Sequence, residues 1–207
     1  MRTYIYVDGF NLYYRALKRT PFKWLNLSGL FRTVLQSHHD ILKIKFFTAR
    51  VSERPNDLSK PQRQDTYLHA LQHYCPEVEV YFGHFLTHKV QALLADTGNR
   101  RRLVNVVRTE EKGSDVNLAV HLLNDAWLNA YDCAVVVTND SDIAEAIRLV
   151  KKHKRKWIGL ITPGTSHTSQ ELRVHADFLR RIRKGALQRN QLPSPIPGTK
   201  ITKPTNW

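Results

Sequence analysis

The chain has 207 residues, of which 42% are hydrophobic and 10% aromatic, and its 32 Lys and Arg against 18 Asp and Glu give a formal charge of +14. This composition excludes a disordered or acidic solvating chain, and the length suits one domain with its own hydrophobic core. The two cysteines, Cys75 and Cys133, lack CxxC or metal-ligand spacing, which argues against a disulfide framework and a structural zinc site.

Short β-rich runs alternate with stretches of helical periodicity along the chain. The predicted strands are 3–7, 44–48, 78–82, 134–138 and 157–161, with a further short strand at 103–107. The predicted helices are 12–18, 27–36, 62–74, 115–129, 142–152 and 170–183, and segments 50–60 and 95–102 are expected to be loops. This alternation is typical of an α/β fold with three layers, α/β/α, around a mostly parallel sheet.

The last residues form a separate, proline-rich segment. Four prolines follow residue 191, so we expect a domain over 1–185 and an extended tail over 186–207. Ile196, Ile201 and Trp207 are apolar enough for this tail to lie along the domain.

The sequence contains no recognisable signal peptide or membrane span. Asp8 interrupts the first apolar run before it reaches the length of a signal peptide, and no stretch approaches the roughly 20 apolar residues of a membrane span. We therefore expect a cytoplasmic location and no membrane partner, and the oligomeric state is left open.

The positive charge is distributed unevenly. Residues 148–207 hold 14 of the 32 Lys and Arg but only 2 of the 18 Asp and Glu, mostly in KKHKRK (151–156) and RRIRK (180–184). Such clusters attract polyanions through Coulomb forces and counterion release, which favours a nucleic-acid partner. A solvated surface face is the alternative interpretation.

Acidic residues follow two of the predicted strands. Asp8 ends the first strand, and Asp140 and Asp142 come after the strand at 134–138, while Asp115 opens a predicted helix. Ligands of open parallel sheets bind at the carboxyl ends of the strands, so these four carboxylates would share one cleft if the strand ends are neighbours. Each acid could instead cap or complement the dipole of the helix that follows it.

A cluster of carboxylates needs a positive partner. Two like charges ~4 Å apart repel by about 4 kcal/mol at an effective dielectric constant of 20. Oxygen ligands without thiols or imidazoles favour Mg²⁺ or Mn²⁺, which can activate a water molecule toward a phosphate ester. The acids and the basic clusters thus agree on a phosphate-containing substrate.

The motifs VDGFNLYY (7–14), EEKGSDVNLAVHLL (110–123), VVVTNDSDI (135–143) and SQELRVHADFL (169–179), in this order, resemble the NYN domain in its LabA-like branch. This domain is a member of the PIN-like nuclease superfamily. The resemblance implies a PIN-like fold with strand order 3-2-1-4-5 and a metal-dependent ribonuclease activity.

The resemblance also implies which residues form the site. The catalytic, metal-binding acids fall at Asp8, Asp115, Asp140 and Asp142, and Asn11 would steady the site or a metal-bound water. His121 departs from the family pattern, where many relatives carry Asp, and we interpret it as a structural residue.

Further residues are predicted to bind the substrate, although each could equally be a surface charge or a core ring. Their roles would be to neutralise phosphates, to stack on an unpaired base and to hold the strand, and they are Lys112, Arg50, Tyr13, Lys151, Lys152, Lys154 and Arg155.

Two functions follow from this sequence. The leading hypothesis is an Mg²⁺- or Mn²⁺-dependent endoribonuclease that leaves a 5′-phosphate and a 3′-hydroxyl, and the alternative is a non-catalytic RNA-binding regulator. A phosphatase or sugar-nucleotide transferase using the D-S-D at 140–142 is a third possibility, whereas the G-x-x-x-x-G-K-[ST] and G-x-G-x-x-G motifs of NTPases and dehydrogenases are absent.

Overall fold

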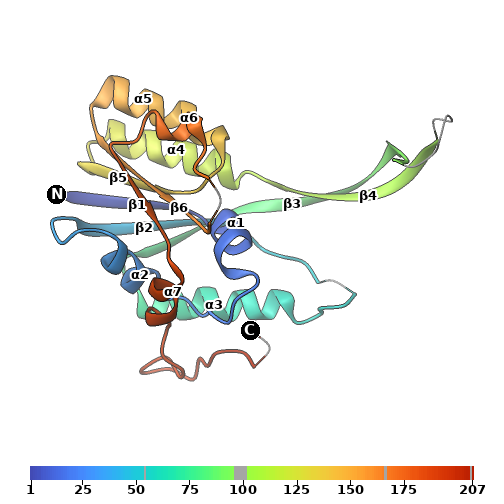
Figure 1. Cartoon of the computed structure of the whole chain (residues 1–207). Helices are drawn as coiled ribbons and strands as arrows, with labels where there is room; N and C mark the ends of the chain where they lie inside the picture. The colour runs from blue at the N-terminus through green and yellow to red at the C-terminus, as the bar shows by residue number, and fades with distance from the viewer. Residues whose placement is uncertain (54, 96–101, 166, 206) are drawn as a thin grey trace.

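The computed structural model describes residues 1–53, 55–95, 102–165, 167–205 and 207, and these residues build a seven-stranded sheet (Figure 1). The strands are β1 (Arg2–Asp8), β2 (Asp40–Ala49), β3 (Val78–Leu93), β4 (Leu103–Lys112), β5 (Cys133–Val137), β6 (Trp157–Thr162) and β7 (Phe178–Arg181). Their order is β4-β3-β2-β1-β5-β6-β7, and every neighbouring pair is parallel except β3 and β4. The five central strands confirm the predicted order, and β4 and β7 extend the two edges.

Helices cover both faces of this sheet, which confirms the three-layer architecture (Figure 1). One face carries α1 (Gly9–Leu12), the π-helix η1 (Tyr13–Leu17), α2 (Leu27–Val34), α3 (Lys60–Tyr74) and α7 (Lys184–Arg189). The other carries α4 (Ser114–Trp127), the 3₁₀ helix η2 (Ser141–Ile143), α5 (Ala144–Lys154) and α6 (Gln170–Arg173). Because strand side chains alternate, Ile5 and Val7 of β1 pack into the first layer and Tyr6 into the second.

The strand predicted at 78–82 is only the first part of β3. Beyond Gly83, β3 pairs with the antiparallel β4 in a long two-stranded arm that extends away from the sheet (Figure 1). The short strand predicted at 103–107 is confirmed as the first half of β4, but most side chains of the arm are exposed or half-exposed, and its full length was not predicted. Part of the predicted loop 95–102 lies outside the described residues.

The helix predicted over 170–183 is wrong. Helix α6 ends at Arg173, and Asp177 then fixes the chain to β6, because its backbone N–H donates to Ile158 O at 2.7 Å and its carboxylate accepts from Ile158 N at 2.7 Å. This pairing starts β7. Local periodicity cannot reveal an edge strand that depends on a partner twenty residues earlier.

The tail packs along the domain, as its apolar residues predict. Leu192 N donates to Trp24 O at 2.8 Å, Trp24 Nε1 donates to Pro193 O at 3.1 Å, and Ile196 is buried. Trp207 packs edge-on against Trp24, with ring centroids 6.4 Å apart. The tail is therefore part of the first helical layer, while the division of the chain at residue 185 stays a prediction.

The two cysteines are free thiols. Cys75 and Cys133 are buried and form no disulfide, and burial raises the pKa of both thiols, that of Cys133 to about 12.

Within the described part of the chain, we find no helix with the length and apolar character needed to span a bilayer.

A buried ion pair joins α4 to the sheet. Lys45 Nζ of β2 lies 2.6 Å from Asp125 Oδ2 of α4, and the Tyr6 hydroxyl donates to the same oxygen at 2.7 Å. The two charged side chains are only 7% and 9% exposed. His121 Nδ1 lies 3.4 Å from Lys45 Nζ, and the His121 ring packs on Tyr81. His121 therefore contacts the buried ion pair.

We expect Lys45→Met to lower the free energy of unfolding by about 3–5 kcal/mol, because it leaves a buried carboxylate without its cation. Urea denaturation measures this change. Lys43→Met is the matched control, since Lys43 lies on the same strand and pairs with Glu79 at a partly exposed position, where about 1 kcal/mol or less is expected. Equal losses in the two variants would contradict this account.

Candidate active site

The carboxyl ends of β1 and β5 lie side by side. Val7 pairs with Val137, so Asp8 and Thr138 leave the sheet together, and the Thr138 hydroxyl donates to Asp8 Oδ2 at 2.8 Å. Asn139 N donates to Asn11 Oδ1 at 3.1 Å and ties the two following loops. Gly9 is required here, because a Cβ at this position would lie 2.7 Å from both Phe46 Cζ and Phe47 O.

An acidic hollow of about 200 Å³ opens at this edge of the sheet. It contains three of the four predicted acids, and its lining residues are Asp8, Phe10, Asn11, Tyr14, Arg15, Glu111, Ser114, Asp115 and Asp140. We call this feature the acid hollow. Asp142 is not among the lining residues, and its backbone N–H donates to Asp140 Oδ1 at 3.1 Å.

Glu111 is an acid of the hollow that the sequence analysis missed. Its carboxylate accepts from Ser114 N at 3.0 Å and from Ser114 Oγ at 2.8 Å, immediately before α4. Gly113 adopts a left-handed conformation (φ 95°) that turns the chain into the helix and brings Asp115 to its first turn. The sequence carries no standard signal for this role, because the capping box places its acid three residues after the N-cap residue and Glu111 comes before the helix.

Asp8 and Asp140 both cap a helix and line the acid hollow. Asp8 accepts from Asn11 N at 2.8 Å and caps α1, and Asp140 caps η2 through Asp142 N. A carboxylate has about four lone-pair sites, so each of these acids keeps acceptor capacity beyond its cap. Asp115 lies in the first turn of α4, whose first N–H, that of Ser114, donates to Glu111 and not to Asp115.

Burial and mutual repulsion disfavour the charged state of these acids. Burial raises the pKa of Asp115 to about 6, and the charges of Asp8, Asp140, Glu111 and Asp142 add to this effect. Burial also raises the pKa of Asp8, although hydrogen bonds from Asn11 and Thr138 oppose it. Among the described residues, none of the predicted acids forms an ion pair with a Lys, Arg or His.

The donor chemistry of the hollow fits a hard divalent cation. Among the described residues, no group of three His, Cys, Asp or Glu side chains is placed so that the three could hold one metal ion together. Mg²⁺ seldom needs such a group, because it keeps several water ligands and binds through one or two carboxylates together with substrate phosphates. Asp8, Asp115 and Asp140 supply carboxylate oxygens in one small space whose charge calls for a cation.

Three of the predicted substrate contacts lie outside the acid hollow. Arg50 follows β2 and stacks on Phe82, 4.6 Å from the ring centroid, while pairing with Asp65. Lys112 ends β4 and lies 2.9 Å from Glu110. Tyr13 lines a neighbouring cavity instead.

The structure does not bring the 151–156 cluster to the acids. Helix α5 starts after Asp142 at the acid edge and runs back for about 16 Å to the amino end of β6. Lys151, Lys152, Lys154 and Arg155 therefore lie at the opposite edge of the sheet, where Lys151 pairs with Asp177. The prediction that these residues hold a strand beside the acids is not supported, because a parallel crossover reverses the chain direction.

The second basic cluster, RRIRK (180–184), lies at the edge of the sheet where the parallel strands end and the acids lie. Strand β7 runs parallel to β6, so Arg181 and Arg183 emerge where the acids do. A groove of about 1270 Å³ forms there, and its cationic lining residues are Arg173, Arg180, Arg181, Arg183, Lys184 and Arg189. No acid of the described chain lines this basic groove, and none of its six cations forms an ion pair with a described carboxylate.

The basic groove adjoins the acid hollow. Its lining includes His167 and Thr168 of the loop after β6. Asn139, next to Asp140, holds this loop by donating to His167 O at 2.9 Å and accepting from Ser169 N at 2.8 Å. Asn139 therefore connects the loop that lines the groove to the segment that carries Asp140.

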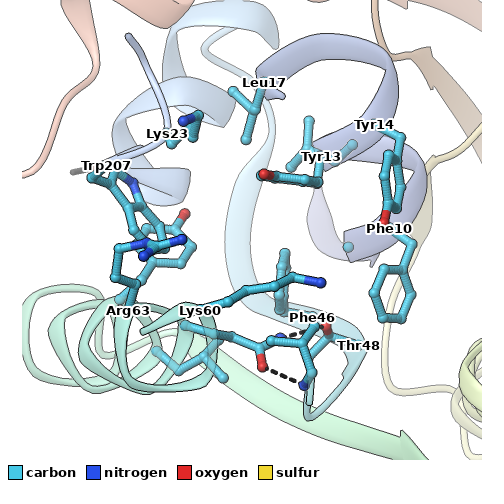
Figure 2. A pocket seen from close by; sticks show the side chains of 16 residues that line it. Phe10, Tyr13, Tyr14, Leu17, Lys23, Phe46, Thr48, Lys60, Arg63 and Trp207 are labelled. Carbon is cyan, nitrogen blue, oxygen red and sulfur yellow. Dashed lines mark hydrogen bonds between the residues drawn. The ribbon is translucent and has the colours of Figure 1, made fainter. Parts of the chain in front are cut away.

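A third cavity, of about 130 Å³, lies between α1, η1, β2 and α3 (Figure 2). Aromatic rings and cations line it, and Phe10 and Tyr14 line both this cavity and the acid hollow. We call it the ring cavity.

Comparisons with known proteins agree with this fold. The NYN domain family model matches residues 2–182. The chain is 35% identical to 6-hydroxy-3-succinoylpyridine 3-monooxygenase HspA of Pseudomonas putida (strain DSM 28022 / S16). The alignment is 237 positions long and covers 100% of this chain and 75% of that protein. A crystal structure of a protein of unknown function from Vibrio parahaemolyticus RIMD 2210633 superimposes with a TM-score of 0.56 at 18% identity, over 88% of this chain and 93% of that one.

We expect the contribution of Asp115 to the stability of the metal-free protein to fall as pH rises from about 4 to 6. The folded pKa of Asp115, about 6, exceeds its ordinary value of 3.8, so the folded state binds the proton more tightly and loses this advantage on ionisation. Asp115→Asn should remove this fall and raise stability at pH 7 by about 1–2 kcal/mol, allowing for partial exposure.

Thermal denaturation across this pH range in EDTA measures the effect. Asp132→Asn is the control, because Arg2 lowers the pKa of Asp132 and its contribution therefore has the opposite sign. A pH profile of Asp115→Asn that matches wild type would contradict the electrostatic description of the hollow.

Proposed function

Because the chain belongs to the NYN domain family, a PIN-like nuclease domain, we propose that it hydrolyses phosphodiester bonds of RNA with Mg²⁺ or Mn²⁺ bound at the acid hollow. The observation that carries this proposal is the convergence of Asp8, Asp115 and Asp140 in one hollow, where burial and mutual repulsion raise the pKa of Asp115 to about 6. The assignment to the LabA-like branch stays a prediction.

The residues of the hollow have distinct roles in this proposal. One or two of Asp8, Asp115 and Asp140 would hold the ion together with phosphate oxygens of the substrate, and the ion when bound supplies a Lewis acid and a water molecule of lowered pKa. Thr138 and the backbone N–H of Asn11 favour the ionised form of Asp8 through their hydrogen bonds. Asn11 positions the loop that carries Asp140 by accepting from Asn139 N.

The basic groove would bind the strand that is cut. Its arginines can pair with phosphate oxygens through two parallel hydrogen bonds, and its loop at His167 is hydrogen-bonded to Asn139, the neighbour of Asp140. This replaces the 151–156 cluster, predicted from composition, with the 180–184 cluster as the proposed strand-binding surface.

We expect Asp8→Asn and Asp140→Asn to lower RNA cleavage by at least about 100-fold while the proteins remain folded. Asp142→Asn is the matched comparison, since Asp142 lies next to Asp140 but does not line the hollow, and its loss should be much smaller. Cleavage of a labelled single-stranded RNA in Mg²⁺ or Mn²⁺, with EDTA as the metal-free control, measures these effects. Folded wild type that binds RNA but leaves it intact in both metals would favour the non-catalytic regulator.

We expect Arg181→Ala combined with Arg183→Ala to weaken RNA binding and to reduce the slope of log affinity against log salt by about 1–2. Lys152→Ala combined with Lys154→Ala removes the same number of charges at the opposite edge and should leave the slope near that of wild type. Fluorescence anisotropy at several salt concentrations measures both. A larger effect from the second pair would contradict the placement of the strand.

A second candidate function is the oxygenation of a small heteroaromatic compound. A relative with this activity in its name is 35% identical over the whole chain, and the ring cavity offers aromatic walls and cations next to the acid hollow. Conversion of 6-hydroxy-3-succinoylpyridine in the presence of O₂ and a two-electron reductant tests it. Turnover that persists in Asp140→Asn would separate this activity from hydrolysis.

A further inference from the structure

The ring cavity has the size of one six-membered ring. Its volume of about 130 Å³ is close to the roughly 150 Å³ of an engineered cavity that holds benzene. Phe46, Tyr67 and Leu68 contribute to its lining from β2 and α3, and Tyr13 and Leu17 contribute from η1. Such walls favour a flat apolar body and offer ring faces on which it can stack.

Polar groups also line the cavity. Trp207 belongs to its lining, although the Trp207 Nε1 atom is itself buried and has no hydrogen-bond acceptor among the described residues. Figure 2 shows Trp207 at one end of the cavity and Tyr13 and Lys60 reaching into it from opposite sides.

The charge of the cavity is positive. Lys23, Lys60 and Arg63 line it, and no acid of the described chain does. Arg63 pairs with Asp57 at 2.6 Å, yet it is also near enough to the Tyr13 hydroxyl to oppose the effect of burial on the Tyr13 pKa. A ligand that fills the cavity should therefore carry a negative group beside its ring.

The geometry points to a binding site for a single six-membered aromatic ring bearing a carboxylate or phosphate. Two sources share this chemistry: a pyrimidine nucleotide and a free aromatic acid. Phe10 and Tyr14 border both the ring cavity and the acid hollow, so an occupant of the cavity lies directly beside the proposed site of hydrolysis. The inference goes beyond the proposed function and does not depend on it, because it concerns binding without metal.

Isothermal titration calorimetry in EDTA tests this site with uridine 5′-monophosphate in one arm and pyridine-3-carboxylate in the other. Lys23→Met should weaken binding by about tenfold, the effect of losing one charge-assisted hydrogen bond. Arg19→Met is the matched control, since its exposed side chain is close in sequence but does not line the cavity. Val51→Phe fills the cavity without changing its charge and should abolish binding of both probes.

Binding in the nucleotide arm alone supports the site and assigns it to the RNA strand, and binding in the acid arm alone supports it as a site for free aromatic acids. Competition between the two probes supports one shared cavity. No binding of either probe, or binding that survives Val51→Phe, overturns the inference. Because the titrations contain neither metal nor RNA, their failure is distinct from a failure of the proposed hydrolysis.

Discussion

The parallel pairing of β1 with β5 is the constraint on which the rest of this site depends. This pairing brings the ends of two strands, more than 120 residues apart in sequence, to one point, and Thr138 fixes it by donating to Asp8. Asp8 and Asp140 then face the same small space, and α4 adds Asp115 from the side. Burial prevents water from screening these charges fully, so the folded protein carries a concentration of negative charge that hydrogen bonds relieve only in part.

The sequence predicted the parts of the protein that are set by buried, local patterns. Strands β1, β5 and β6 are buried over most of their length and read as apolar runs, and the acids that follow β1 and β5 could be assigned to one edge by a general rule of parallel sheets. Of the long β3–β4 arm, whose side chains are mostly exposed or half-exposed, it predicted only the segment 103–107, and it did not predict β7, which exists because Asp177 pairs with β6. Glu111 was overlooked because its capping role is visible only with Ser114 in place.

The sequence shows where the basic clusters lie along the chain but not at which edge of the sheet each one lies. Helix α5 carries one cluster away from the acid edge, whereas β7 delivers the other to it, and only the chain path distinguishes the two. The three features are connected through a few residues. Asn139 connects the loop that lines the basic groove to the segment that carries Asp140, and Phe10 and Tyr14 line both the acid hollow and the ring cavity.

The central claim is that the clustered carboxylates bind a divalent cation. Anomalous X-ray scattering from crystals soaked in Mn²⁺ tests it most directly, because the metal is located independently of any activity. We expect an anomalous peak within the acid hollow, which Asp8, Asp115 and Asp140 line, and we expect it to disappear in Asp140→Asn crystals. Soaked crystals with no peak there, while Mn²⁺ occupies exposed carboxylates elsewhere, would contradict it.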